Sequence, residues 1–219
     1  EMADIIEYDN QNWLDAVLDA CISLRSQGHS PLLLGGYSFG GALALQAAAQ
    51  IHPDGLVLIA PFTWREPAWG KALGDFFRTL LPLSVHPFRH LPINQPSLVE
   101  NYQMYLPEID FDNPNHRDEL THFEFPLAVL DRLRNVGKQG LQAAQEVRTP
   151  TLIIHSLEDQ VIQPRSIEVL ENKLGGPVTR ESVRGPHSLT MPHHPAFKAV
   201  ASKTLAFAMR IQTSNSSQE

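Results

Sequence analysis

Three side chains of this sequence have the types and the order that acyl transfer requires. Ser38 lies in GGYSFGG directly after the apolar run PLLL, Asp159 lies in TLIIHSLEDQVIQP, and His187 lies in RGPHSLTMP. A nucleophilic serine needs a base that takes its proton, and the base needs an acid that orients it. Each of the three follows a predicted strand. We therefore predict a catalytic triad of Ser38, Asp159 and His187.

The glycines around Ser38 indicate a sharp turn from a strand into a helix. We expect Gly36 and Gly40 to remove side chains that would collide in this turn, with Tyr37 completing the nucleophile elbow. The same turn places the amide of Phe39 at a helix N-terminus beside the hydroxyl. An amide in that position can stabilise the oxyanion that forms when an acyl carbonyl is attacked, so Phe39 is the predicted oxyanion donor.

The other histidines are predicted to have no catalytic role. His155 lies inside a predicted strand, which indicates a core or wall histidine, and His193 and His194 precede a helix start, where we expect them to be solvated. Neither that pair nor the pair His86 and His90 has acidic or cysteine companions at a recognisable spacing. No metal site is predicted.

The elements that must position these residues follow from the apolar pattern. Continuous apolar runs at 32–34, 55–60 and 151–155 are typical of parallel strands buried on both faces, and the alternating run 177–183 predicts a less buried strand. Helices are predicted at 10–27, 42–50, 164–174 and 195–211. The first is expected to bury a stripe of Trp13, Val17, Ala20 and Leu24, and the last a stripe of Phe197, Val200, Ala201, Thr204 and Ala208. This order predicts an α/β architecture with an insertion.

We expect the chain to divide into a first part of the core (1–62), a helical cap or lid (63–148), a second part of the core (149–211) and a disordered tail (212–219). The insertion is rich in proline and aromatic residues. KALGDFFRTLL has apolar residues at helical spacing, and Ser97 with Glu100 forms a capping box for a second helix. These apolar stripes indicate either packing or a lid over a binding cleft.

For two residues of this region the sequence leaves two interpretations open. Asp75 lies in the first of its amphipathic segments, which favours a solvated position, although some thioesterases place their acid earlier in the chain. Trp64 follows the second strand and could line an acyl pocket or anchor the lid.

Composition excludes several classes of protein. The chain has 219 residues and a formal net charge of -7, which argues against a nucleic-acid-binding surface. No apolar run approaches the ~20 residues of a membrane span, so stable membrane insertion is not expected. Cys21 is the single cysteine, which excludes an internal disulfide, and the start EMADIIEY resembles no signal peptide. A cytoplasmic location is expected, and the first residue is not methionine, which suggests a cut or a boundary.

The segments LLLGGYSFGGALAL, GLVLIAPF, PTLIIHSLEDQVIQP and GPHSLTMP resemble those of α/β-hydrolases of the carboxylesterase and monoacylglycerol-lipase-like kind. The insertion lies where this family carries its cap. The resemblance implies a mostly parallel sheet with flanking helices, and hydrolysis of a small-molecule carboxylic ester through an acyl-enzyme, without metal or organic cofactor. Glu158 could serve as the acid, but the family pattern of an acid, a short apolar pair and proline favours Asp159.

The chain also departs from that family. Only 37 residues precede Ser38, whereas the family has several earlier strands and a second oxyanion amide donated by an early loop. Loss of one such donor typically costs about a hundred- to a thousandfold in rate. An apolar sheet edge beside the serine strand is expected to promote aggregation. We interpret the chain as a fragment or processed form of a longer protein, in preference to one completed by a partner chain.

Two alternatives to an esterase remain open on the sequence. The first is a thioesterase, because many thioesterases have the same nucleophile-elbow sequence, GYSFGG. The second is a non-catalytic binding module that keeps the hydrolase pocket as a ligand site. The apolar cap favours acyl chains or monoglyceride-like lipids over charged substrates. The sequence predicts no oligomeric state.

Overall fold

The computed structural model describes residues 10–65, 84–85, 110–122 and 124–216. Two compact units are present, one formed by residues 1–66 together with 132–219 and the other by residues 67–131. The predictions for KALGDFFRTLL, for the capping box of Ser97 and Glu100, and for Asp75, His86 and His90 fall outside the described residues.

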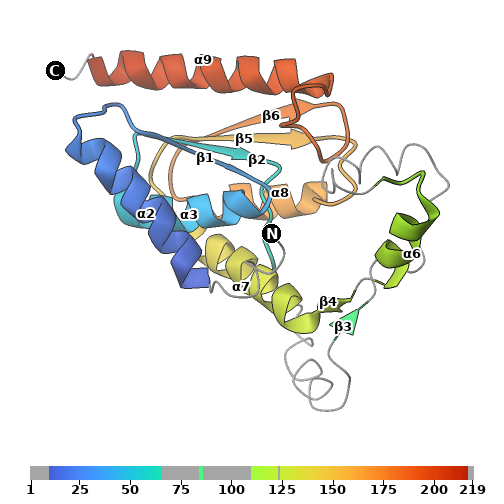
Figure 1. The fold of residues 1–219 in the computed structure, drawn as a ribbon. Coiled ribbons are helices and arrows are strands. Elements are labelled where there is room, and N and C mark those ends of the chain that lie inside the picture. Colours follow the sequence, from blue (N-terminus) through green and yellow to red (C-terminus); the bar gives the residue numbers. More distant parts are fainter. Residues whose placement is uncertain (1–9, 66–83, 86–109, 123, 217–219) are drawn as a thin grey trace. The chain divides into compact units, whose positions relative to one another are not determined.

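The first unit contains a four-stranded parallel sheet. Its strands are β1 (Leu33–Tyr37), β2 (Gly55–Ile59), β5 (Thr151–Ser156) and β6 (Val178–Val183), in the order β1-β2-β5-β6 (Figure 1). Every residue of β5 is buried, as expected for a central parallel strand covered on both faces. The prediction of a mostly parallel α/β sheet is confirmed.

Helices cover both faces of this sheet. α9 (Ala196–Ser216) lies on one face, and α3 (Phe39–Ile51) and α8 (Pro164–Glu171) lie on the other (Figure 1). α2 (Asn10–Ser26) packs against α3. The core between the layers combines aliphatic side chains of the strands with apolar residues of α8 and α9. The small residues of α3 bring that helix close to the sheet.

The predicted apolar faces of the outer helices need correction. In α2 the buried residues are Leu14 and Cys21, whereas Ala20 and Leu24 of the predicted stripe are exposed. In α9, Ala201 is exposed, and the buried residues are Ala196, Val200, Phe207 and Ile211. Only one narrow face of each helix is buried. Because apolar residues occur on several faces, the sequence does not specify which face that is.

α9 also continues through Ser216, so the predicted disorder of the tail is wrong for residues 212–216. None of the helices among the described residues is both long enough and apolar enough to cross a bilayer.

α7 (Leu127–Ala143) starts in the second unit and ends in the first. Its C-terminal half packs closely on α3, because a Cβ at Gly140 would lie 2.7 Å from the Ala42 carbonyl oxygen. The buried amide of Gln46 donates to the Val136 carbonyl at 3.2 Å. Residues 132–148 therefore lie in the same unit as the sheet, whereas the predicted cap extends to residue 148.

The second unit contains α6 (Pro114–His122) and a short antiparallel pair, β3 (Ser84–Val85) with β4 (Phe125–Pro126). The sequence predicts only helical segments in this region. Strands of two residues are too short to produce an alternating pattern, which explains why they were missed.

Candidate active site

Ser38 occupies the turn between β1 and α3 in a strained backbone conformation, with φ 49° and ψ -118°. Three hydrogen bonds hold this backbone. Its N–H donates to the Ile59 carbonyl at 2.9 Å, and its carbonyl accepts from the N–H groups of Gly41 at 3.0 Å and Phe62 at 2.8 Å. The end of β2 thus fixes the residue that presents the hydroxyl.

The turn tolerates no side chain at Gly36, where a Cβ would lie 2.3 Å from the Gly40 carbonyl oxygen. The predicted collision at Gly40 is wrong, because a Cβ there would meet nothing within 4 Å. The second steric constraint falls on Gly41 instead, where a Cβ would lie 2.8 Å from the Cβ of Pro61. The contact comes from a segment that follows β2, so the local motif could not reveal it.

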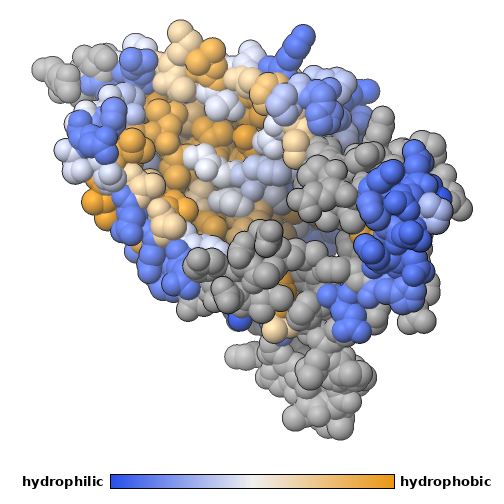
Figure 2. Space-filling model, in the orientation of Figure 1, coloured by the Kyte–Doolittle hydropathy of each residue, from blue (hydrophilic) through white to orange (hydrophobic). Residues whose placement is uncertain are grey.

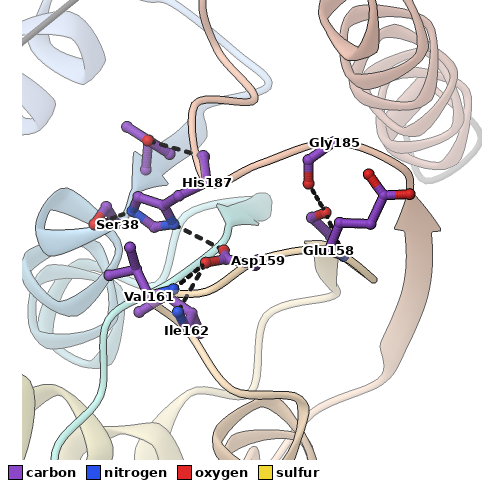
Figure 3. Close-up of polar contacts among 9 residues, drawn as sticks. Ser38, Glu158, Asp159, Val161, Ile162, Gly185 and His187 are labelled. Atoms are coloured by element: carbon purple, nitrogen blue, oxygen red, sulfur yellow. Dashed lines mark hydrogen bonds and ion pairs between the residues drawn. The ribbon is translucent and has the colours of Figure 1, made fainter. Parts of the chain in front are cut away.

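The three predicted triad residues lie in one hydrogen-bonded chain (Figure 3). His187 Nε2 is 2.9 Å from Ser38 Oγ, and His187 Nδ1 is 2.8 Å from Asp159 Oδ2. The side chains of His187 and Asp159 are 12% and 1% exposed. A carboxylate can only accept, so it selects the tautomer with the proton on Nδ1 and leaves Nε2 free to take the serine proton.

The second oxygen of Asp159 is held by backbone amides. Oδ1 accepts hydrogen bonds from the N–H groups of Val161 and Ile162, both at 2.8 Å (Figure 3). Burial by itself raises the pKa of this carboxyl, but the hydrogen bonds from His187, Ile162 and Val161 outweigh burial and lower it below its usual value. Asp159 is therefore ionised at neutral pH and stabilises a charged imidazole.

Glu158 takes no part in this chain, because its side chain points away from His187 in Figure 3. Its backbone N–H donates to Ser156 Oγ at 3.0 Å, and the same hydroxyl donates to the Gly185 carbonyl. Ser156 is 1% exposed, and it joins the loop that carries the acid to the loop that carries the histidine. The sequence motifs do not point to this residue, whose signal is a hydroxyl at the end of a predicted buried strand.

Tyr37 also has a contact that the motif did not reveal. Its hydroxyl donates to the His187 carbonyl at 3.0 Å, and the two rings have centroids 5.2 Å apart. The last residue of β1 thus supports the loop that presents His187.

Phe39 is the first residue of α3, directly after the serine. Among the backbone hydrogen bonds formed outside the helices and strands of the described chain, none uses the Phe39 N–H as donor. Its ring packs edge-on against Trp13 of α2, with centroids 5.2 Å apart. The free amide thus lies at the positive end of a helix beside the Ser38 hydroxyl.

The remaining histidines have structural surroundings. His155 is 4% exposed, and its Nδ1 lies 3.1 Å from the Glu181 carbonyl. Burial, with a contribution from Arg180, lowers its pKa, as expected for a core histidine. His194 is half-buried and accepts the Ala196 N–H at 3.1 Å, so it caps α9 and the prediction of a solvated side chain is wrong for it. His193 is exposed.

Within the residues that the structure describes, no cluster of His, Cys, Asp or Glu could hold a metal ion. Trp64 is half-buried in the first unit, 6.5 Å from the Phe62 ring centroid, with the Arg134 guanidinium 4.9 Å above its ring.

A parallel sheet with flanking helices, a serine at a strand-to-helix turn and a histidine after the last strand define an α/β-hydrolase. The family described as serine aminopeptidase, S33 (Hydrolase_4), matches residues 12–184. The chain belongs to this family.

Solved structures share the fold at low identity. A structure reported for the metagenome-derived lipolytic enzymes LipS and LipT is 19% identical with a TM-score of 0.67, over 95% of this chain and 76% of that chain. A monoacylglycerol lipase from Paleococcus ferrophilus is 17% identical with a TM-score of 0.56, over 89% and 74%. A thioesterase domain from the curacin biosynthetic pathway is 17% identical with a TM-score of 0.52, over 90% and 73%. No curated protein sequence matches the chain significantly.

Proposed function

We propose that this hydrolase cleaves carboxylic esters of small to medium acyl groups through an acyl-enzyme intermediate. The observation that carries the proposal is the continuous chain from Ser38 Oγ through His187 to Asp159, with both connecting distances below 3 Å. The residues are the nucleophile, the base and the orienting acid that acyl transfer needs.

The reaction follows from the positions of the atoms. His187 Nε2 removes the proton from Ser38 Oγ as that oxygen attacks the ester carbonyl, and Asp159 stabilises the imidazolium that forms. The Phe39 amide donates to the oxyanion of the tetrahedral intermediate. Nε2 then gives its proton to the departing alcohol, which leaves an acyl group on Ser38. Water, activated by the same nitrogen, releases the acid and restores the serine.

The choice of an ester rests on the chemistry of the bond. An alcohol is a better leaving group than an amine, so an ester asks less of the oxyanion site than an amide does. The lipolytic and lipase neighbours agree with an ester, the thioesterase neighbour supports a thioester as the second candidate, and the family description includes aminopeptidases. The cap at residues 63–148 stays a prediction from the sequence.

The test is the intact mass after exposure to a fluorophosphonate probe, on protein shown by circular dichroism to be folded. We expect a single adduct that is absent from Ser38→Ala. Folded protein without an adduct would contradict the catalytic assignment and favour a binding module.

Rates on matched oxygen esters, thiol esters and aminoacyl anilides then identify the bond. We expect the oxygen ester to be cleaved fastest. A thiol ester cleaved faster than its matched oxygen ester would assign a thioesterase, and a preference for the anilide would assign a peptidase.

A further inference from the structure

The first unit contains a cavity of about 240 Å³ that the proposed reaction leaves unused. Its wall has three kinds of side chain in pairs: the guanidinium groups of Arg65 and Arg165, the hydroxyls of Thr63 and Ser166, and the aliphatic groups of Leu141 and Val169. Such a wall can donate several hydrogen bonds to a ligand and can also contact an apolar part of it.

Two residues of the cavity lining directly follow, in the chain, residues that hold the triad. Thr63 follows Phe62, whose N–H donates to the Ser38 carbonyl at 2.8 Å. Gln163, which also lines the cavity, follows Ile162, whose N–H donates to Asp159 Oδ1 at 2.8 Å. The walls thus continue directly from the segments that hold the nucleophile and the acid.

The charge of the cavity is opposite to that of the chain. The protein has a formal net charge of -7, yet the described residues that line the cavity include two arginines and no carboxylate. Within the described part of the chain, neither Arg65 nor Arg165 forms a hydrogen bond or an ion pair. Two guanidinium groups on the wall of one cavity favour an anion there, because each can donate paired N–H groups to a carboxylate or phosphate.

The size of the cavity limits what can enter it. Pockets that enclose a whole drug-sized ligand usually measure about 300–1,000 Å³, so about 240 Å³ suits one group of a substrate and not the whole molecule. A carboxylate or phosphate fits the guanidinium forks, and the hydroxyls can donate to its remaining oxygens.

We propose that the cavity binds an anionic group, a carboxylate or phosphate, on the part of the substrate away from the bond that is cleaved. The inference rests on the proposed hydrolase function and narrows it to negatively charged esters. Leu141 and Val169 would contact the carbon chain that links the anion to the ester. This preference is opposite to the uncharged acyl substrates expected from the sequence.

The kinetic test compares 4-nitrophenyl valerate with mono-4-nitrophenyl glutarate, which have equal chain lengths but end in a methyl group and a carboxylate. We expect a higher kcat/KM for the glutarate ester. Arg65→Gln and Arg165→Gln should each raise KM for that ester about tenfold with little change in kcat, as expected for the loss of one hydrogen bond to a charged group. The valerate ester should be unaffected.

Arg210→Gln is the matched control, because Arg210 is an exposed arginine of α9 outside the cavity. It should change neither ester. A wild-type protein that does not prefer the glutarate ester, or arginine variants that affect both esters equally, would overturn the proposal.

A binding measurement separates this inference from the hydrolase function. Calorimetric titration of Ser38→Ala with glutarate and with inorganic phosphate should show binding that Arg165→Gln weakens about tenfold, and the tighter of the two ligands identifies the anion. Binding without ester cleavage by the wild type would leave the cavity assignment standing and refute the hydrolase. Ester cleavage without anion binding would support the hydrolase function and refute the cavity assignment.

Discussion

The two outer strands of the sheet, β1 and β6, each lead to one member of the triad but differ in composition. β1 reads LLGGY and has no charged residue, and Ser38 follows it directly. β6 reads VTRESV, and its charged residues form ion pairs, Arg180 with Glu171 at 3.2 Å and Glu181 with Lys203 at 2.6 Å. His187 follows β6 after a short loop.

Charged side chains are a common protection for a strand that ends a sheet, because they disfavour pairing with another chain. β6 has this protection, whereas β1 has the composition of an inner strand. Figure 2 shows an apolar area between α9 and α2, where Figure 1 places β1. Among the described residues, the serine side of the site is held by backbone hydrogen bonds and close packing, whereas ion pairs also stabilise the strand on the histidine side.

The largest effect on activity is expected at Asp159, which follows the inner strand β5 and contacts His187. Asp159→Asn should lower kcat on the order of 10⁴-fold, because an amide no longer fixes the tautomer of His187. The same variant reports on stability. The folded-state pKa of Asp159 is lowered, so its carboxylate stabilises the protein above the ordinary aspartate pKa near 4, and this contribution is lost as the pH falls through the lowered folded value.

Urea unfolding of wild type and Asp159→Asn measures this contribution. The wild type should be more stable at pH 7 by about 1–3 kcal/mol, and the difference should disappear as the pH falls below 4 towards the lowered value. A difference that stays constant down to pH 2 would show that the carboxylate charge is not responsible.

The glycines on the two sides of Ser38 allow a comparison, with Gly36 in β1 and Gly40 in α3. Gly36→Ala places a Cβ 2.3 Å from a backbone oxygen, and we expect it to lower the free energy of unfolding by about 3 kcal/mol and to reduce probe labelling of Ser38. Gly40→Ala is the matched control, since it enters open space in a helix and should be neutral or stabilise by up to about 1 kcal/mol. Equal effects of the two substitutions in urea unfolding would refute the steric account.

A smaller effect is expected for the hydrogen bond that links β1 to the histidine loop. Tyr37→Phe removes the donor to the His187 carbonyl and leaves the ring contact. We expect kcat to fall about three- to tenfold with KM unchanged, because the loss of one neutral hydrogen bond costs about 1 kcal/mol. An effect on KM alone would place Tyr37 in substrate binding instead.

The smallest effect on stability should come from adding a charge to β1, the end strand of the sheet among the described residues. Gly35 is exposed in β1, and its nearest neighbour for an added Cβ is at 3.9 Å, so Gly35→Lys should change the free energy of unfolding by about 0.5 kcal/mol or less. It should reduce concentration-dependent association in sedimentation velocity. Ser182→Lys on β6 should have no such effect, because that edge is already charged. If both variants associate as much as the wild type, the claim that β1 lacks the protection of β6 is wrong.

The sequence was sufficient for the sheet and for the relative placement of Ser38, Asp159 and His187, because buried parallel strands produce continuous apolar runs and the reactive residues follow their ends. Predictions failed where a contact depends on a distant segment. Gly41 is constrained by Pro61, His194 caps a helix, and the buried face of α2 is set by its packing against α3. No local pattern contains that information.

The positive φ of Ser38 also has a consequence for selection experiments. A residue with a side chain in such a conformation costs about 1–3 kcal/mol, and glycine avoids most of that cost. In a library of variants at position 38 sorted only for resistance to heat or protease, glycine should therefore become enriched over serine. Serine should return only when survival also requires turnover.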